Sequence, residues 1–204
     1  MIKPEFDIRH VQIKKREIVY KGFFSIEKIQ LSHALFKGGE SGGMQRELFE
    51  RGEAVALLLF DPAANTVVLT EQFRIGALQD TTSPWLLELV AGMVEEGESP
   101  EQVAVREAEE ESGCLVEKLL PVCQYWVSPG GSSERLHVFC AAVNSAGMGG
   151  IFGLQEEHED IKVHVVPCEM AFAAVRSGRI NNAATIIALQ WLQLNYVWVK
   201  EQLS

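Results

Sequence analysis

Residues 99–113 carry start and stop signals for a short helix, and these residues constrain the fold more than any other stretch of the chain. Ser99-Pro100-Glu101-Gln102 has the spacing of a capping box, with proline at the first helical position. Gly113 stands where a helix commonly ends in a left-handed residue. We therefore predict a helix of about three turns between these two signals, which is an ordinary length.

Three glutamates share one face of this predicted helix. Residues three and four apart on a helix are neighbours, so Glu107, Glu110 and Glu111 converge. Their charges repel one another unless a cation neutralises them, and carboxylate oxygens suit Mg²⁺ or Mn²⁺. The alternative is a solvated acidic face, because the chain has 28 Asp and Glu residues and some clustering is expected.

Other residues around the helix follow fixed offsets that helical periodicity does not explain. The chain matches the pattern G-x5-E-x7-R-E-U-x-E-E-x-G-U, where U is apolar, at Gly92, Glu98, Arg106, Glu107, Glu110, Glu111 and Gly113. The two apolar positions of the pattern hold Ala108 and Cys114. This pattern is the signature of the Nudix hydrolases, and the chain resembles that family. We call residues 92–114 the Nudix box.

Charge and composition limit the classes of binding partner and the cellular compartment that we expect for this protein. A formal net charge of −10, with no basic stripe, argues against nucleic acid. An anionic small molecule is still compatible, because a bound metal reverses the local field. No apolar run approaches the length of a membrane span, and residues 1–10 lack the apolar core of a signal peptide, so we expect neither feature. The four cysteines lack metal-binding spacing, so we expect reduced thiols in a cytoplasmic protein.

Residues 1–45 are expected to form an N-terminal subdomain of antiparallel strands. Residues 11–20 and 23–36 alternate polar and apolar side chains, and Lys21-Gly22 is the turn between them. A glycine-rich connection follows at 38–43. Two or three strands bury too little surface to be stable alone. This subdomain must therefore pack on the main domain or on a second subunit.

Residues 46–204 are expected to form the main domain, an α/β/α sandwich around a mixed sheet. Apolar, β-rich runs alternate with few helices. We expect strands at 54–60, 66–73, 121–127, 135–143 and 162–168, with 85–92 leading into the box helix. Two C-terminal helices are expected, one over 169–177 and one from an Asn181 or Asn182 cap to about Lys200.

Within the Nudix superfamily, the chain is most similar to the ADP-ribose pyrophosphatases. That subfamily has a proline about sixteen residues beyond the last box glycine, and Pro129 lies sixteen residues after Gly113. The N-terminal strands and the segments around the box resemble the bacterial enzymes of this group. In those enzymes the strand piece is exchanged between two subunits, so the resemblance implies a homodimer.

The box residues divide into metal ligands and structural residues. We expect Glu107 and Glu111, one helical turn apart, to coordinate the metal, with Glu110 close behind as a catalytic residue. The resemblance adds the backbone carbonyl of Ala91 as a ligand. We expect Arg106 and Glu98 to form an ion pair that holds the loop against the helix. The positions assigned a structural role in the motif are Gly92, Glu98, Arg106 and Gly113.

A second acidic cluster lies at 156–160, after a glycine-rich segment. The resemblance assigns Glu157 as the general base and Glu159 as a further catalytic residue and metal ligand. A mobile loop beside a metal site can deliver such groups on closure. The alternative is a solvated loop, and we interpret His158 as an exposed loop residue.

Four residues are candidates for substrate contact. The resemblance places Arg46 and Arg74 in substrate-binding segments, and Arg suits a bidentate phosphate clamp. It also places Phe23 where an aromatic ring from the neighbouring subunit stacks on adenine. Glu134 can accept a hydrogen bond from a ribose hydroxyl. The alternatives are surface ion pairs for the arginines and core packing for Phe23.

These features predict a Mg²⁺-dependent enzyme that hydrolyses the diphosphate of ADP-ribose to AMP and ribose 5-phosphate. Another nucleoside diphosphate sugar, such as GDP-mannose, is the alternative substrate. A Nudix module that binds ADP-ribose without catalysis is a third hypothesis. It is disfavoured because the chain retains Glu107, Glu110 and Glu111.

Overall fold

The structure is a computed structural model that describes residues 1–154 and 158–203. The chain divides into two compact units, one of residues 1–53 with 126–135 and one of residues 54–125 with 136–204. The first unit therefore extends past the expected 1–45 subdomain. It gains a third strand and a loop that comes much later in the sequence.

The first unit is a three-stranded antiparallel sheet in the order β1-β2-β3. It follows a single-turn helix η1 (Ile8–His10) and consists of β1 (Val11–Lys21), β2 (Ser25–His33) and β3 (Met44–Glu50). The predicted turn lies between β1 and β2, and the glycine-rich connection between β2 and β3. Residues 126–135 join the unit through backbone hydrogen bonds of Phe49 with Gly131 and Ser133.

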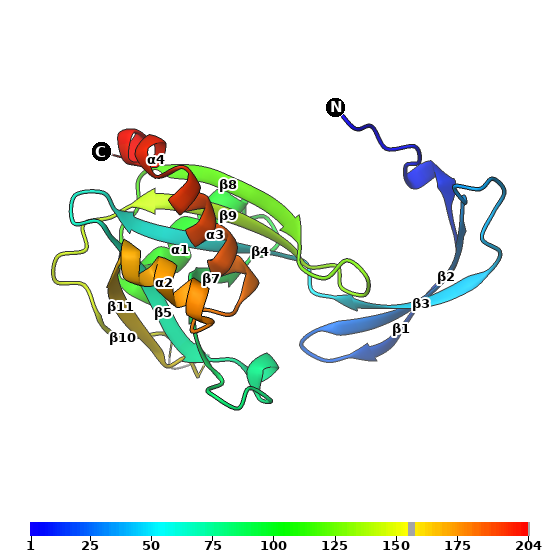
Figure 1. The fold of residues 1–204 in the computed structure, drawn as a ribbon. Coiled ribbons are helices and arrows are strands. Elements are labelled where there is room, and N and C mark those ends of the chain that lie inside the picture. The colour runs from blue at the N-terminus through cyan, green and yellow to red at the C-terminus, as the bar shows by residue number, and fades with distance from the viewer. Residues whose placement is uncertain (155–157, 204) are drawn as a thin grey trace. The chain divides into compact units, whose positions relative to one another are not determined.

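The second unit contains the remaining strands in one eight-stranded sheet (Figure 1). Its main path runs β10-β11-β5-β4-β9-β8, with β6 paired to β5 and β7 paired to β4. The strands are β4 (Glu53–Asp61), β5 (Thr66–Phe73), β6 (Trp85–Glu88), β7 (Val90–Met93), β8 (Leu119–Trp126), β9 (Arg135–Ala142), β10 (Gly150–Phe152) and β11 (Ile161–Pro167). A short helix η2 (Ile75–Ala77) follows β5.

The sheet is mixed, as predicted. The pairs β4–β5, β5–β6, β4–β7, β5–β11 and β10–β11 are antiparallel. Strand β9 runs parallel to its neighbour β4. At one end the Arg135 amide donates to the Gly52 carbonyl, and at the other the Val143 amide donates to the Phe60 carbonyl. Central strand β4 is apolar from Ala54 to Phe60, as expected for a strand with both faces buried.

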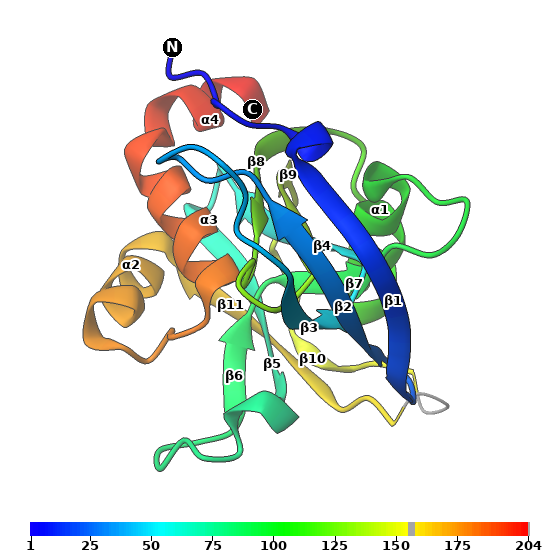
Figure 2. The ribbon, with the colours of Figure 1, turned by 90° about the vertical axis from the view of Figure 1, so that its right-hand side faces the viewer.

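Helices cover both faces of the sheet and make the predicted α/β/α sandwich (Figures 1 and 2). The box helix α1 (Pro100–Ser112) packs on one face, where Val103, Ala104 and Ala108 join a buried cluster. The opposite face carries α2 (Cys168–Ser177), α3 (Ala183–Leu194) and α4 (Tyr196–Leu203) over a larger cluster. Among the described residues, no helix is long and apolar enough to cross a membrane.

Three details differ from the sequence-based expectation. The single helix expected from an Asn181 or Asn182 cap to about Lys200 begins after Asn182 and is two helices, because the Asn195 side chain donates to the Trp191 carbonyl and ends the first of them. Residues 85–92 contain two strands, β6 and β7, that pair with different neighbours. The glycine-rich segment 147–153 contains strand β10, in which Ile151 and Phe152 favour a strand and which pairs with β11.

Candidate active site

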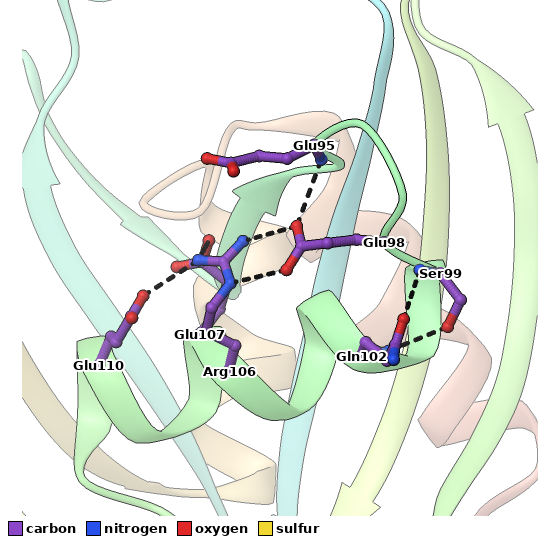
Figure 3. Close-up of polar contacts among 7 residues, drawn as sticks. All are labelled: Glu95, Glu98, Ser99, Gln102, Arg106, Glu107 and Glu110. Atoms are coloured by element: carbon purple, nitrogen blue, oxygen red, sulfur yellow. Dashed lines mark hydrogen bonds and ion pairs between the residues drawn. The ribbon is translucent and has the colours of Figure 1, made fainter.

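The box helix begins and ends where the sequence predicts. The Ser99 hydroxyl accepts from the Gln102 amide at 3.3 Å, and the Gln102 side chain accepts from the Ser99 amide at 2.8 Å (Figure 3). At the other end, Gly113 adopts a left-handed φ of 68° and closes the last turn. These caps fix which residues of α1 face the sheet.

Strand β7 brings its backbone against the acidic face of α1. The amide of Ala91 donates to Glu111 Oε2 at 3.0 Å. A Cβ added at Gly92 would lie 1.8 Å from Glu107 Oε1, so any side chain there would displace that carboxylate. Gly92 is therefore required for space, and the two box glycines serve different purposes.

Arg106 links the helix to the loop that precedes it (Figure 3). Its Nε and Nη2 each lie 3.2 Å from an oxygen of Glu98, whose Oε2 also accepts from the Glu95 amide at 3.2 Å. Its Nη1 donates to Glu107 at 2.8 Å and to Glu110 at 3.0 Å. The expected Arg106–Glu98 ion pair is present. The hydrogen bonds from Arg106 hold the pKa of Glu98 below its usual value.

Two box carboxylates titrate far above the usual range. Burial raises the pKa of Glu107 to about 7, although the charge and hydrogen bond of Arg106 oppose this shift. Burial also raises the pKa of Glu111 to about 8, with the Ala91 amide opposing it. The negative charge of Glu159 adds to both increases. Without a cation, these two groups therefore hold protons near neutral pH.

This donor set fits a divalent cation. Among the described residues, no three His, Cys, Asp or Glu side chains form a ready-made cage, and Arg106 engages Glu107 and Glu110. Mg²⁺ does not need such a cage, because it usually binds one or two carboxylates and keeps several waters. Glu107 and Glu111 supply hard oxygen donors in a buried setting where a cation would relieve the cost of their charges.

The second acidic cluster is described in part. Glu157 lies outside the described residues. Glu159 Oε2 accepts from the Leu154 amide at 3.2 Å, and Gly153 leaves room for the Glu159 backbone. The negative charge of Glu159 is close enough to raise the pKa of both Glu107 and Glu111. His158 has a left-handed φ of 57° and is exposed.

Arg74, at the end of β5, lies close to the buried carboxylates. Its Nε is 2.5 Å from Glu88 Oε2, and its positive charge lowers the pKa of Glu111. The second unit therefore brings together Ala91, Gly92, the box acids, Glu159 and Arg74.

The other three candidate residues belong to the first unit. Phe23 is exposed and packs edge-on against Phe24, with ring centroids 4.7 Å apart, so it does not belong to the core. Arg46 is exposed on β3 and donates to the Gln45 carbonyl. Glu134 lies in the 126–135 loop and forms an ion pair of 2.8 Å with Arg51.

Sequence reasoning missed Arg51. Its guanidinium lies 4.3 Å from the ring centroid of Phe24, and its Nε is buried without a hydrogen-bond partner among the described residues. With Glu134 it forms part of a pocket of about 470 Å³, whose other lining residues are Phe49, Ser128, Gly131 and Ser132. Arg51 follows the end of β3, where no strand periodicity marks its direction.

Comparison with known proteins agrees with this architecture. The NUDIX domain family matches residues 50–189. ADP-ribose pyrophosphatase of Escherichia coli (strain K12) is 49% identical over 207 residues, covering 99% of each chain. GDP-mannose pyrophosphatase of Cronobacter sakazakii (strain ATCC BAA-894) is 33% identical over 91% of this chain and 96% of its own. A crystal structure of an ADP compounds hydrolase shares the fold, with a TM-score of 0.71, 20% identity and coverage of 97% and 98%.

The raised pKa values predict how Mg²⁺ stabilises the protein. A carboxyl with a higher pKa in the folded state favours folding at low pH, and this contribution is lost as the pH rises through the folded value. In EDTA, the melting temperature should therefore fall between pH 6 and pH 9 as Glu107 and Glu111 ionise. Mg²⁺ should raise it more at pH 8.5 than at pH 6, measured by thermal unfolding. Equal stabilisation at both pH values in wild type, or an unchanged pH dependence in Glu111→Gln, would contradict this interpretation.

Gly92→Ala should abolish hydrolysis, because the new methyl group collides with Glu107. We expect a loss of about 100-fold or more in kcat, as for removal of a group that stabilises the transition state. Gly76→Ala is the matched control, because a Cβ at Gly76 meets no atom within 4 Å. Steady-state kinetics of both variants test this, and similar activities would show that the close approach at Gly92 is unimportant.

Proposed function

This chain belongs to the NUDIX domain family, and on that premise we propose that it is a Mg²⁺-dependent hydrolase that converts ADP-ribose to AMP and ribose 5-phosphate. The observation that carries this proposal is the full-length likeness to ADP-ribose pyrophosphatases, together with the buried Glu107–Glu111 pair. GDP-mannose is the second candidate substrate, because pyrophosphatases named for it are also relatives of this chain, although more distant ones.

Glu107 and Glu111 would hold the metal, with the Ala91 carbonyl beside them as a third ligand. When bound, Mg²⁺ supplies charge neutralisation to the diphosphate and lowers the pKa of an attacking water. Glu110 is the next carboxylate along the same face of α1 and remains the third catalytic candidate. Arg106 holds the loop at Glu98 against the helix and so keeps the carboxylates in place.

The proposed general base and a further metal ligand come from the second acidic cluster. Glu157 is assigned as the base by its position in the sequence alone. Glu159 is supported by its electrostatic effect on Glu107 and Glu111. A base in this cluster would take the proton of the attacking water. A carboxylate can act as this base when it lies within hydrogen-bond reach of that water.

Candidate substrate-binding residues are proposed in each unit separately. Arg74 suits the diphosphate, since its guanidinium can donate two hydrogen bonds to phosphate oxygens. Phe23, Arg46 and Glu134 are proposed for the adenine and ribose groups. We add Arg51, because its buried Nε has no partner among the described residues and its pocket combines a cation, an aromatic ring and a carboxylate.

The N-terminal sheet supports a proposal of a homodimer. Strand β1 is exposed along almost all of its length, including Ile13, Ile18 and Val19. Exposed apolar side chains on one strand are typical of a surface covered by a partner. A cytoplasmic location is also proposed, with the four cysteines, all free in the structure, remaining reduced.

Glu111→Gln should reduce turnover by at least about 100-fold, because it removes a metal-binding charge while keeping the shape of the side chain. Glu109→Gln is the control, since Glu109 lies on the same helix and is exposed. Hydrolysis rates with saturating Mg²⁺ and circular dichroism of each variant provide the measurement. Near wild-type turnover in Glu111→Gln would refute the metal role.

A panel of nucleoside diphosphate sugars identifies the substrate. Purified protein with Mg²⁺ should release AMP from ADP-ribose with a higher kcat/KM than for GDP-mannose or UDP-glucose. Faster release from GDP-mannose would replace the first candidate with the second. Tight ADP-ribose binding with no hydrolysis of any compound would indicate a sensor.

Ile18→Glu should weaken the dimer, because it places a charge on the exposed apolar strand. Analytical ultracentrifugation at micromolar concentration should give a dimer for wild type and a larger monomer fraction for the variant. Lys15→Glu, a change on the same strand at a residue that is already charged, is the control. A wild-type protein that sediments as a monomer would exclude the proposal.

A further inference from the structure

Gln72 on β5 is a buried polar residue with no partner for its amide nitrogen. The residue is 7% exposed, and Nε2 has no hydrogen-bond acceptor among the described residues. An unpaired buried amide is unfavourable, and native proteins pair most such groups. This donor therefore requires an explanation that the free protein does not supply.

Strand geometry places Gln72 on the α1 side of the sheet. Alternate residues of a strand face the same way, and Val68 belongs to the cluster beneath α1. Thr70 and Gln72 therefore face the box helix. The backbone stays extended through Arg74, with φ −124° and ψ 114°, so Arg74 faces the same side.

Glu88 on β6 lies diagonally across from Gln72. The antiparallel register pairs Thr70 with Glu88 and Gln72 with Leu86. Diagonal neighbours on one face are about 7–8 Å apart at the backbone, which two long side chains can span. Glu88 instead binds Arg74, at 2.5 Å, and its side chain is 16% exposed. Gln72 thus lies between Thr70 and Arg74 on this face, within reach of the Glu88 carboxylate that Arg74 binds.

We propose that Gln72 is a positioning residue that hydrogen-bonds Glu88 when Arg74 leaves this carboxylate to bind the phosphate of the substrate. Nε2 then donates to the Glu88 carboxylate, which would otherwise be left largely buried and unpaired. Losing a partner from such an ion pair is costly, so a substitute donor lowers the cost of releasing Arg74. This inference rests on the proposed role of Arg74 in binding the diphosphate.

Thermal unfolding of the free protein tests, without any substrate, whether Gln72 can replace Arg74 as the partner of Glu88. The variants are Arg74→Ala, Gln72→Met and the double variant, because Met has a similar shape and no donor. Gln72→Met alone should leave the melting temperature unchanged or slightly higher. The double variant should melt about 3–6 °C below the sum of the two single effects. Additive effects, or a large loss from Gln72→Met alone, would overturn the proposal.

Binding of ADP-ribose in EDTA, measured by calorimetry, tests the liganded state. Gln72→Met should weaken binding about tenfold, as expected for loss of a hydrogen bond to a charged group. In a Glu88→Gln background the same change should have little effect, because no carboxylate then needs a partner. An undiminished effect would mean that Gln72 touches the ligand directly and would overturn the positioning role. Non-additive unfolding in a protein that does not bind ADP-ribose would fault the proposed substrate and leave the Gln72–Glu88 contact supported.

Discussion

The burial of two carboxylates between a helix and a strand is the constraint on which the catalytic unit depends. Glu107 and Glu111 have little access to water, so neighbouring groups must supply what the solvent does not. Gly92 makes room for one carboxylate, the Ala91 amide donates to the other, and Arg106 ties the first to the preceding loop. This explains why the box extends beyond the helix at offsets unrelated to helical period.

Features that depend on a few consecutive residues could be predicted from the sequence. The ends of α1 are set by the Ser99 cap and by Gly113, and both signals act within one turn of helix. Helix α2 ends before the left-handed Gly178 for the same reason. The apolar runs of β4 and β5 identify them as buried strands. The box acids could be assigned to one face because helix geometry alone brings them together.

Features that depend on distant parts of the chain could not be predicted in this way. Arg51 contacts Glu134, 83 residues later, and the ring of Phe24, and neither contact follows a local pattern. Gln72 becomes notable only through the register of β5 with β6. Strand β10 exists because β11 pairs with it. The residues expected to contact substrate in the first unit came from family resemblance, since no local pattern distinguishes them.

The unit around β1–β3 is assembled from two separate stretches of the chain. Phe49 on β3 exchanges backbone hydrogen bonds with the 126–135 loop, which leaves β8 and returns to β9. Removing the first 53 residues would thus leave that loop without its bonding partner and Glu134 without Arg51. The N-terminal strands are not an independent module that can be lost or replaced by recombination at one point. Exchange of this unit between related proteins would need two coordinated crossovers, which ties its inheritance to that of the hydrolase unit.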